Sequence, residues 1–493
     1  MQHRCLNWTG ALLFAFLVMA AIADRSLAGP PGKTDPPKPL PEKIVAVWKE
    51  AGAEFAWIHQ VRPGFVELVS TKESKPGDLP AFCFTAFQEG RIANLPAPTS
   101  AFGLILYGKD VTDAGLKDLI ALKNMQSLSL VETRITDVGL KELATLKSLQ
   151  SLFLIASKVT DNGLKEIAQL KTLQTLSLDR TEVTDAGLKE LATLKDLQTI
   201  SLIGTELTDE GLKGLASVKG LQTLNLGKSQ VSNPGLKELA NLKSLQSLYL
   251  GHTKVTDTGL KDLTGMKGLQ LLYLSDTEVT DAGLKGLARI PGLRSLSLAN
   301  TEVTDAGLKE LAKLTNLDTL FLDRTKTTDV GLKELAKLKN LQTLNLNSTM
   351  VTDAGLKELA GLKKIQRMYL VRTKVTDTGL QHLGGLQDLQ TLFLGSTKVT
   401  DTGLKVLAGL KSLQTLDVNS TNVTDAGLKE LTGLKSLQEL NLGGTQITDV
   451  GLKVLAKLRS LLRLNLSETQ VTDSGVEQLR KLLPDCQILN HGG

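Results

Sequence analysis

The sequence predicts an α/β solenoid built from repeated strand–helix units, and three observations support this fold class. The glycine of a T-D-x-G motif recurs every 24 residues without an insertion. Within one unit, Leu152 and Leu154 alternate with polar residues, which is the period of a strand. Leu164, Ile167 and Leu170 then recur every three residues and form one apolar helical face. An uninterrupted period of this length is typical of a solenoid, whose units become stable by stacking.

The period accounts for most of the chain. Its sixteen glycines stand at positions 115, 139, 163, 187, 211, 235, 259, 283, 307, 331, 355, 379, 403, 427, 451 and 475. Thr160 and Asp161 stand just before the helix of their unit, where a hydroxyl can cap free N–H groups and a carboxylate suits the positive helix end. The Asp column could also suggest calcium, but one carboxylate per unit lacks the clustered oxygen ligands that calcium requires.

The strand–helix pattern resembles the leucine-rich repeat family. The residues 149–167 read L-Q-S-L-F-L-I-A-S-K-V-T-D-N-G-L-K-E-I, which is similar to helix-containing repeats of the ribonuclease-inhibitor type and to 24-residue bacterial repeats. Thr181, Thr253 and Ser157 stand where the family often has Asn. The resemblance covers residues 102–490, about sixteen repeats. It implies an open horseshoe solenoid with a parallel β-sheet on the concave side and helices on the convex side.

Four segments are expected along the chain. Residues 1–23 combine a weakly basic start with an apolar run and an A-x-A pattern, which predicts a secretory signal peptide cleaved after Ala23. An uncleaved N-terminal anchor stays open as an alternative. Residues 24–41 form a proline-rich linker, and residues 42–101 a small N-terminal cap that starts with a short helix. Residues 102–490 hold the repeats, and 483–488 look like a truncated final strand.

These features place the mature protein outside the cytosol and exclude several protein classes. The expected location is secreted, periplasmic or on the cell surface, with no membrane span in the mature chain. Lys and Arg total 57 against 52 Asp and Glu, too small an excess for a dedicated nucleic-acid binder. Three cysteines exclude a disulfide scaffold, and we expect Cys83 and Cys486 to be far apart and unpaired, although an intermolecular disulfide stays open.

No catalytic motif is present in the sequence. It contains no H-E-x-x-H, no G-x-S-x-G and no phosphate-binding glycine loop, and its five histidines are scattered. We therefore expect no enzyme activity, no catalytic residue, no metal site and no cofactor. The segment 40–45 faintly resembles the start of an F-box, which leaves a ubiquitin-ligase adaptor as a remote alternative.

The candidate binding residues come from one strand position. Every Phe and Tyr beyond residue 110 lies between the two strand leucines, on the face opposite the leucine core. Aromatic side chains on an exposed sheet face are typical of a binding surface, and arginine is a frequent partner for them. Packing between strands is the alternative explanation. The predicted concave-face ligand-binding residues are Phe153, Tyr249, His252, Tyr273, Phe321, Arg324, Arg367, Tyr369, Arg372 and Phe393.

These residues indicate a non-enzymatic, exported protein that binds a protein partner through its concave face. Asp179, Asp323 and Asp417 add negative charge to this face, which argues against a nucleic-acid groove. Binding of a glycan or another cell-envelope polymer through the same aromatic residues is the main alternative, and a structural spacer without a ligand is another. The lysines beside the helices predict a solvated convex face or a weak attraction for anionic polymers. The ligand, the role of the cap and the oligomeric state stay open.

Overall fold

The computed structural model describes residues 39–62, 65–71 and 73–490, and the chain divides into two compact units, Met1–Leu272 and Tyr273–Gly493. The predicted signal peptide and most of the predicted linker lie outside the described residues. None of the helices in the described ranges has the length and apolar character that a membrane span requires.

The first unit holds the N-terminal cap and the first repeats. Its cap elements are α2 (Glu42–Glu50), β1 (Glu54–Arg62), β2 (Phe65–Val69) and β3 (Leu79–Phe84). Its repeat strands are β4 (Phe102–Tyr107), β5 (Met125–Val131), β6 (Ser151–Phe153), β7 (Thr175–Ser177), β8 (Thr199–Ser201), β9 (Thr223–Asn225) and β10 (Ser247–Tyr249). Its repeat helices are η2 (Ala114–Leu119), α3 (Asp137–Leu143), α4 (Asp161–Ile167), α5 (Asp185–Leu188), η3 (Lys189–Thr193), α6 (Asp209–Leu215), α7 (Asn233–Leu239), α8 (Asp257–Leu260) and η4 (Lys261–Gly265), the η elements being 3₁₀-helices.

The second unit holds the remaining repeats, and strand β11 (Leu271–Tyr273) contains the division. Its strands are β12 (Ser295–Ser297), β13 (Thr319–Phe321), β14 (Thr343–Asn345), β15 (Arg367–Tyr369), β16 (Thr391–Phe393), β17 (Thr415–Asp417), β18 (Glu439–Asn441), β19 (Arg463–Asn465) and β20 (Gln487–Leu489). Its helices are α9 (Asp281–Leu287), α10 (Asp305–Leu311), α11 (Asp329–Leu335), α12 (Asp353–Leu359), α13 (Asp377–Leu380), η5 (Gln381–Leu383), α14 (Asp401–Leu407), α15 (Asp425–Leu431), α16 (Asp449–Leu455) and α17 (Asp473–Leu482).

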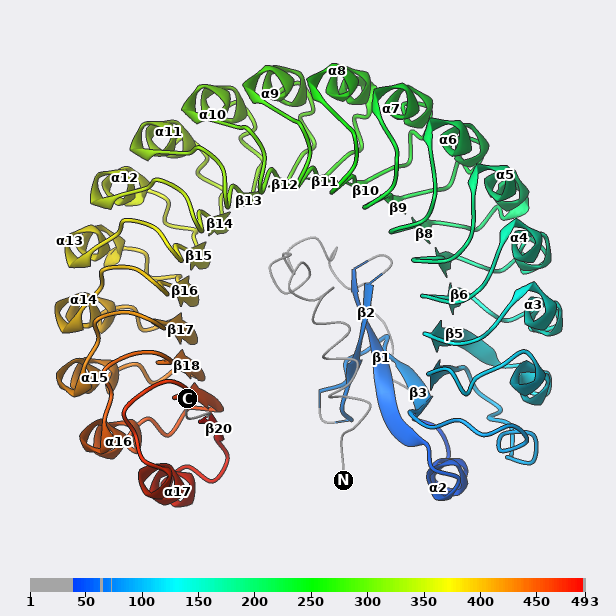
Figure 1. Ribbon diagram of the computed structural model, residues 1–493, viewed down its shortest axis with the longest axis horizontal. Helices are drawn as coiled ribbons and strands as arrows, with labels where there is room; N and C mark the ends of the chain where they lie inside the picture. Colours follow the sequence, from blue (N-terminus) through cyan, green and yellow to red (C-terminus); the bar gives the residue numbers. More distant parts are fainter. Residues whose placement is uncertain (1–38, 63–64, 72, 491–493) are drawn as a thin grey trace. The chain divides into compact units, whose positions relative to one another are not determined.

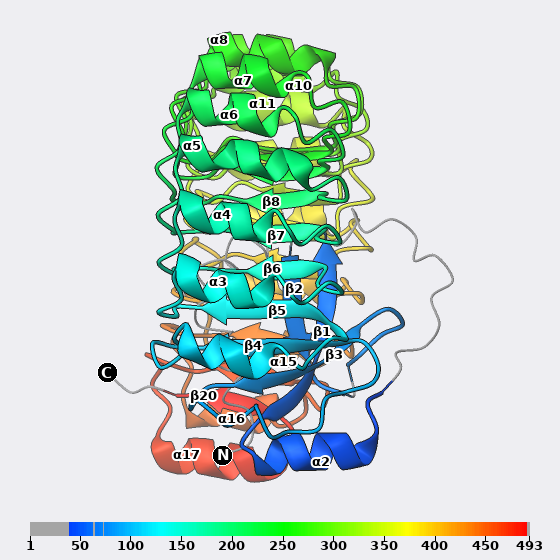
Figure 2. The same ribbon diagram turned by 90° about the vertical axis from the view of Figure 1, so that its right-hand side faces the viewer.

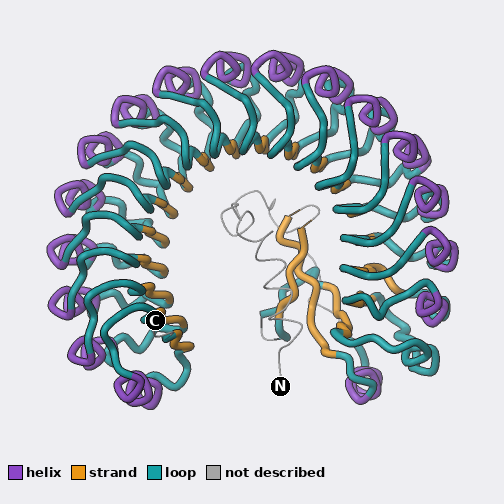
Figure 3. Tube along the Cα trace, viewed as in Figure 1, coloured by secondary structure: helices purple, strands orange, loops and turns teal. Residues whose placement is uncertain are grey.

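Within each unit, the repeat strands form a parallel ladder whose register advances by one 24-residue repeat. Leu152 pairs with Leu176 in the first unit, and Leu320 pairs with Leu344 in the second. In both units the strands line the inner side of an arc and the helices its outer side (Figures 1 and 3). Figure 2 shows the helices and strands of the first unit as successive parallel layers. The predicted solenoid, with parallel strands on the concave side and helices on the convex side, is confirmed in each unit.

Aliphatic side chains fill the space between strands and helices. In one repeat, Leu152, Leu154, Val159 and Leu164 are all fully buried. The strand leucines point away from the concave side because successive side chains of a strand alternate between its two faces. The threonines at the family's usual Asn position are buried too, and Thr181 donates from its hydroxyl to the Leu178 carbonyl at 2.6 Å.

The T-D-x-G motif connects each helix to the next repeat. The Thr304 hydroxyl accepts a hydrogen bond from the Ala306 N–H and caps helix α10, as the sequence predicts. Asp305, the first helical residue, instead accepts bonds from the Thr328 N–H at 2.8 Å and the Thr328 hydroxyl at 2.6 Å. The aspartate column therefore joins consecutive repeats, an arrangement that the capping prediction did not include.

The glycine of the motif leaves room for that aspartate. A Cβ on Gly307 would lie 2.4 Å from Asp281 Oδ1 and 2.7 Å from Leu284 Cδ1. Both distances are shorter than van der Waals contact, so any side chain at this position would displace the aspartate of the preceding repeat. Glycine therefore recurs every 24 residues because the aspartate of the preceding repeat occupies the space that its side chain would need.

The N-terminal cap has an aromatic core instead of a leucine core. The fully buried Trp48 of α2, a helix that the sequence predicts, stacks on Phe82 with ring centroids 4.3 Å apart. Its indole N–H donates to the Pro96 carbonyl at 3.0 Å. Strand β3 pairs in parallel with β4, and β1 pairs with β3 antiparallel, so the cap extends the sheet of the first unit at its N-terminal end.

The two cysteines of the predicted mature chain differ in state. Cys486 is free and buried, in agreement with the prediction that it is unpaired. Cys83 is disulfide-bonded, so the prediction that it is unpaired is wrong. Its side chain lies in an apolar cluster with Ile58 and Ala81 of the cap and Ile105 of the first repeat strand, β4.

Candidate interaction surface

The predicted aromatic residues lie on the concave side of each unit, in what we call the inner-face column, the residues between the two strand leucines. The parallel register places each member beside the member of the next repeat, for example Tyr369 of β15 beside Phe393 of β16. Arg367, two residues before Tyr369 on the same strand, lies on the same face. Within each unit, one position of the repeat therefore forms a row of side chains along the sheet.

Most of these aromatic side chains are covered, which differs from the exposed face that the sequence predicts. Phe153, Tyr249 and Tyr273 are each 7% exposed, and Tyr369 is 5% exposed. Neighbouring strands lie only about 4.8 Å apart, so a ring on one strand is covered by the side chains beside it. The packing that was the alternative explanation therefore accounts for much of their surface. Phe393 differs because it stays partly exposed.

Ring contacts join the aromatic residues of the second unit into pairs. Tyr369 and Phe393 meet edge to face with centroids 5.0 Å apart. Tyr273 and Phe321 lie two strands apart, yet their centroids are 6.0 Å apart, and the member between them is the small Ser297. In the first unit, Phe153 is separated from Tyr249 by strands β7 to β9, so the structure does not bring these two together.

The predicted polar partners occupy two different places. Arg367 lies on the strand, and its Nε donates to the Thr343 hydroxyl of the preceding strand at 3.0 Å. His252, Arg324 and Arg372 lie in the turn after the strand and are exposed. All three have a left-handed backbone, with φ of 56°. The equivalent residue of most repeats has the same conformation, and Gly204 and Gly444 occupy this position in two of them. These two glycines, aligned with the arginines, were the sequence signal for this turn.

A ladder of carboxylate and amide groups continues the inner-face column beyond Phe393. Asn441 donates from its side chain to Asp417 at 3.1 Å, and Asn465 donates to Asn441 at 3.0 Å. Burial raises the pKa of Asp417, while hydrogen bonds from Asn419 and Asn441 act in the opposite direction. From the sequence, Asp417 was expected only to add negative charge to this face. The 24-residue spacing of Asp417, Asn441 and Asn465 was the signal that could have identified the ladder.

The other two inner-face aspartates are also held by hydrogen bonds. Asp179 accepts from the Ser201 hydroxyl at 2.6 Å and from the Ile203 N–H at 2.9 Å. Asp323 accepts from the Asn345 amide at 3.0 Å. Burial is the main cause that raises the pKa of each of these two carboxyls. Their hydrogen-bonding capacity is therefore used largely within the sheet.

The residues considered for catalysis do not assemble into a site in the described part of the chain. His59 contacts the buried Asp78 through Nδ1 and Oδ1 at 2.6 Å, inside the N-terminal cap. Within the described ranges, no three His, Cys, Asp or Glu side chains are grouped so that they could hold a metal ion.

Comparisons with known proteins agree with this architecture. The model of a leucine-rich repeat region matches residues 104–329, a two-copy leucine-rich repeat model matches 411–456, and a single-repeat model matches 337–360 and 457–479. No curated protein sequence matches the chain.

The solved structures that match this chain include those of two bacterial proteins and one plant protein. A leucine-rich repeat protein of Leptospira interrogans is 27% identical with a TM-score of 0.46, covering 82% of this chain and 93% of that one. An internalin of Listeria monocytogenes is 20% identical with a TM-score of 0.35, covering 91% and 93%. A plant peptide hormone receptor, RGFR1 in complex with RGF2, is 16% identical with a TM-score of 0.40, covering 88% and 82%. From the matched repeats and the observed strand–helix units, the chain belongs to the leucine-rich repeat proteins.

Proposed function

We propose that the protein is a non-enzymatic, exported recognition protein that binds a protein partner through the concave face of its sheet. Leucine-rich repeat proteins generally mediate protein–protein interactions, and the repeat is typically a scaffold without enzyme activity. The expected location is secreted, periplasmic or on the cell surface, as the N-terminal sequence predicts.

One group of residues in the second unit carries the proposal. The edge-to-face pair Tyr369–Phe393 holds Phe393 in a defined orientation, and Phe393 remains partly exposed. Arg367 lies on the same strand as Tyr369, and the exposed Arg372 follows it in the turn. An ordered aromatic side chain flanked by arginines is the composition that dominates the binding energy of many protein interfaces.

Burial decides which residues of this face can be substituted in a test. The tyrosines of the inner-face column are buried, so replacing them by alanine would leave cavities and destabilise the sheet. Phe393, Arg367 and Arg372 reach the surface and can be removed at a smaller structural cost. We therefore test the face with the triple variant Arg367→Ala/Arg372→Ala/Phe393→Ala.

The test is capture of partners from surface extracts of the source cells by the immobilised wild-type chain, with the captured protein purified and its affinity measured. We expect the triple variant to bind that protein at least about 10-fold more weakly. The control carries Lys405→Ala/Lys429→Ala/Lys453→Ala, three exposed residues on the outer helices, and should bind like the wild type. Thermal unfolding of all three chains verifies that the sheet is intact.

Other outcomes would overturn the proposal. Equal affinity of the triple variant would refute the concave-face site. Binding of purified polysaccharide alone, lost in the same variant, would favour the glycan alternative for this face. Absence of any captured ligand would favour a structural spacer.

A further inference from the structure

A second surface, formed by the loops that lead from the helices to the strands in the second unit, has a strong positive charge. The loops 336–342, 360–366, 384–390, 408–414, 432–438 and 456–462 contain eight Lys or Arg residues and a single acidic residue, Asp388. The opposite connections of the same repeats, 347–353, 371–377, 395–401, 419–425, 443–449 and 467–473, contain three basic and seven acidic residues. Charge is therefore segregated between the two edges of the unit.

We call the cationic side the basic edge, and most of its charges are not neutralised. Lys337 forms an ion pair with Glu334, but the other seven cations of these loops make no salt bridge within the described residues. All seven are exposed. They are Lys339, Lys363, Lys364, Lys411, Lys435, Lys457 and Arg459.

Neutral acceptors hold several of these side chains in place. Lys411 donates to the Ala408 carbonyl at 2.6 Å, and Lys435 donates to the Thr432 carbonyl at 3.0 Å. Both carbonyls lie at the end of a helix, where a cation is favoured by the helix dipole. Helix capping explains Lys411 and Lys435, but it does not require the second cations Lys364 and Lys457 of their loops. The basic edge therefore carries more charge than its helices need.

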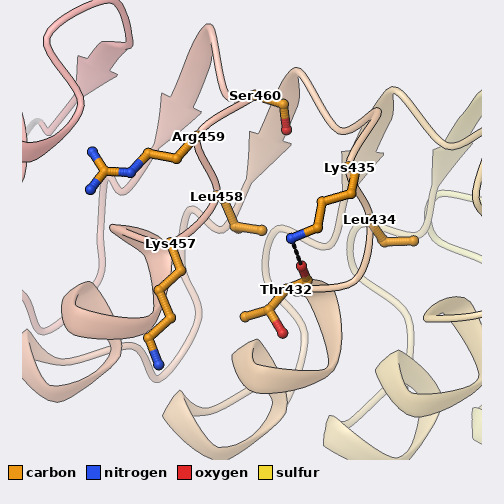
Figure 4. A pocket seen from close by; sticks show the side chains of 7 residues that line it. All are labelled: Thr432, Leu434, Lys435, Lys457, Leu458, Arg459 and Ser460. Carbon is orange, nitrogen blue, oxygen red and sulfur yellow. Dashed lines mark hydrogen bonds between the residues drawn. The ribbon is translucent and has the colours of Figure 1, made fainter.

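A hollow between two successive loops interrupts this edge. It has a volume of about 340 Å³ and is lined by Thr432, Leu434 and Lys435 of one loop and by residues 457–460 of the next. Figure 4 shows the ammonium of Lys435 at the Thr432 carbonyl, while Lys457 and Arg459 come from the neighbouring repeat and point away from Lys435 in two different directions. The apolar side chains Leu434 and Leu458 and the hydroxyls of Thr432 and Ser460 complete the lining. The volume corresponds to about ten water molecules, which is room for one acidic sugar residue.

We propose that the basic edge of the second unit binds a linear anionic polysaccharide, with one acidic sugar seated in the hollow at Lys435, Lys457 and Arg459. Five of the six loops carry at least one cation, and only 384–390, which holds Asp388, carries none. Cations that recur at the spacing of the repeat on both sides of this gap fit a polymer with regularly spaced carboxylates or sulfates. The six loops contain no Phe, Tyr or Trp. They therefore lack the stacking side chains typical of single-stranded nucleic-acid sites and the aromatic anchors of membrane surfaces.

The test compares binding of heparin and polygalacturonate to the full chain by calorimetry at low and at moderate NaCl. We expect both polymers to bind, and added salt to weaken binding because the contacts are ionic. The variant Lys435→Ala/Lys457→Ala/Arg459→Ala should bind about 10-fold more weakly. The control Lys405→Ala/Lys429→Ala/Lys453→Ala removes the same charge from the helices α14, α15 and α16 of the same unit and should change the affinity less than about twofold.

A second variant protects the test against misfolding, because Arg459 also donates to the Leu482 carbonyl. The pair Lys435→Gln/Lys457→Gln keeps that bond and should still show most of the loss of affinity expected for the triple variant. The concave-face variant Arg367→Ala/Arg372→Ala/Phe393→Ala should bind both polymers normally, so failure of this proposal is distinguishable from failure of the proposed function.

Four results would overturn the proposal. They are no binding of either polymer at low salt, equal losses in the edge variant and its helix control, equal affinity for single-stranded oligothymidylate, and binding to phosphatidylglycerol vesicles without binding to the polysaccharides.

Discussion

The helix N-terminal edge and the concave face are built from the same 24-residue repeat, yet they differ in how much they vary. At the helix N-termini, nearly every repeat has the same Thr cap, the same aspartate bond to the next repeat and the same glycine. On the concave face, the inner-face column changes from Ser297 to Phe321 to Asn345 along three successive strands. The helix N-termini therefore make one fixed set of contacts between repeats, whereas the inner-face column makes different contacts along the chain.

The largest effect is expected from a substitution at the helix N-termini. Gly307→Ala places a Cβ 2.4 Å from Asp281 Oδ1, and we expect it to lower the free energy of unfolding by about 3 kcal/mol. Chemical denaturation of the second unit measures the loss. The control Gly409→Ala meets only the Val406 carbonyl at 3.6 Å and should be nearly neutral. Similar losses in both variants would show that crowding by the aspartate is not what requires glycine.

Loss of the hydrogen bonds between repeats should cause the next largest decrease in the free energy of unfolding. Asp305→Ala removes both acceptors of Thr328, and we expect a loss of about 2 kcal/mol in the free energy of unfolding. Asp305→Asn should lose less than about 1 kcal/mol, because Asn233 in the first unit keeps the same two contacts. There the Thr256 N–H donates to Asn233 Oδ1 at 3.0 Å, and Asn233 Nδ2 donates to the Thr256 hydroxyl at 2.9 Å. Equal losses for the two substitutions would mean that the negative charge, and not the pair of bonds, stabilises this edge.

The smallest effect is expected on the concave face, and it depends on pH. Burial raises the pKa of Asp179, so the native state binds this proton more tightly than the unfolded chain does. The wild type therefore gains stability as pH falls through the raised native pKa toward the unfolded value of about 3.9. Asp179→Asn keeps the Oδ1 acceptor for Ser201 and Ile203 and removes the buried charge.

We expect Asp179→Asn to be more stable than the wild type by about 1 kcal/mol at pH 7, and the difference to shrink at pH 4.5. Denaturation curves of both chains at the two pH values measure it, and pH effects common to both chains cancel in the difference. A difference that grows on acidification would contradict the assigned direction of the pKa shift.

Local patterns in the sequence predicted most of the fold. The alternation of Leu152 and Leu154 and the threefold spacing after Leu164 placed the strands and helices, because both periods follow from backbone geometry. The Thr caps were predicted for the same reason, since a cap acts on the N–H groups of its own helix. The aromatic candidates and Arg367 were placed on the concave side of the strands, whereas His252, Arg324 and Arg372 lie in the turn after the strand.

Contacts between repeats could not be predicted in this way. The bond from Asp305 to Thr328 spans 23 residues, and only the stacking distance between repeats decides that the aspartate reaches its neighbour. The burial of Tyr249 and Tyr369 depends equally on the side chains of adjacent strands. The sequence of one repeat does not show which side chains cover these tyrosines. It does not show the left-handed turn at Arg324 and Arg372 either.

The sequence by itself determined that this chain is a solenoid, because a 24-residue period with alternating and threefold apolar spacing leaves each unit an apolar face that only a neighbour can cover. Only the tertiary structure decided which side chains remain available to a ligand. Strand spacing buries the tyrosines and leaves Phe393 and its arginines at the surface, while the direction of the helices collects the cations of the second unit on one edge.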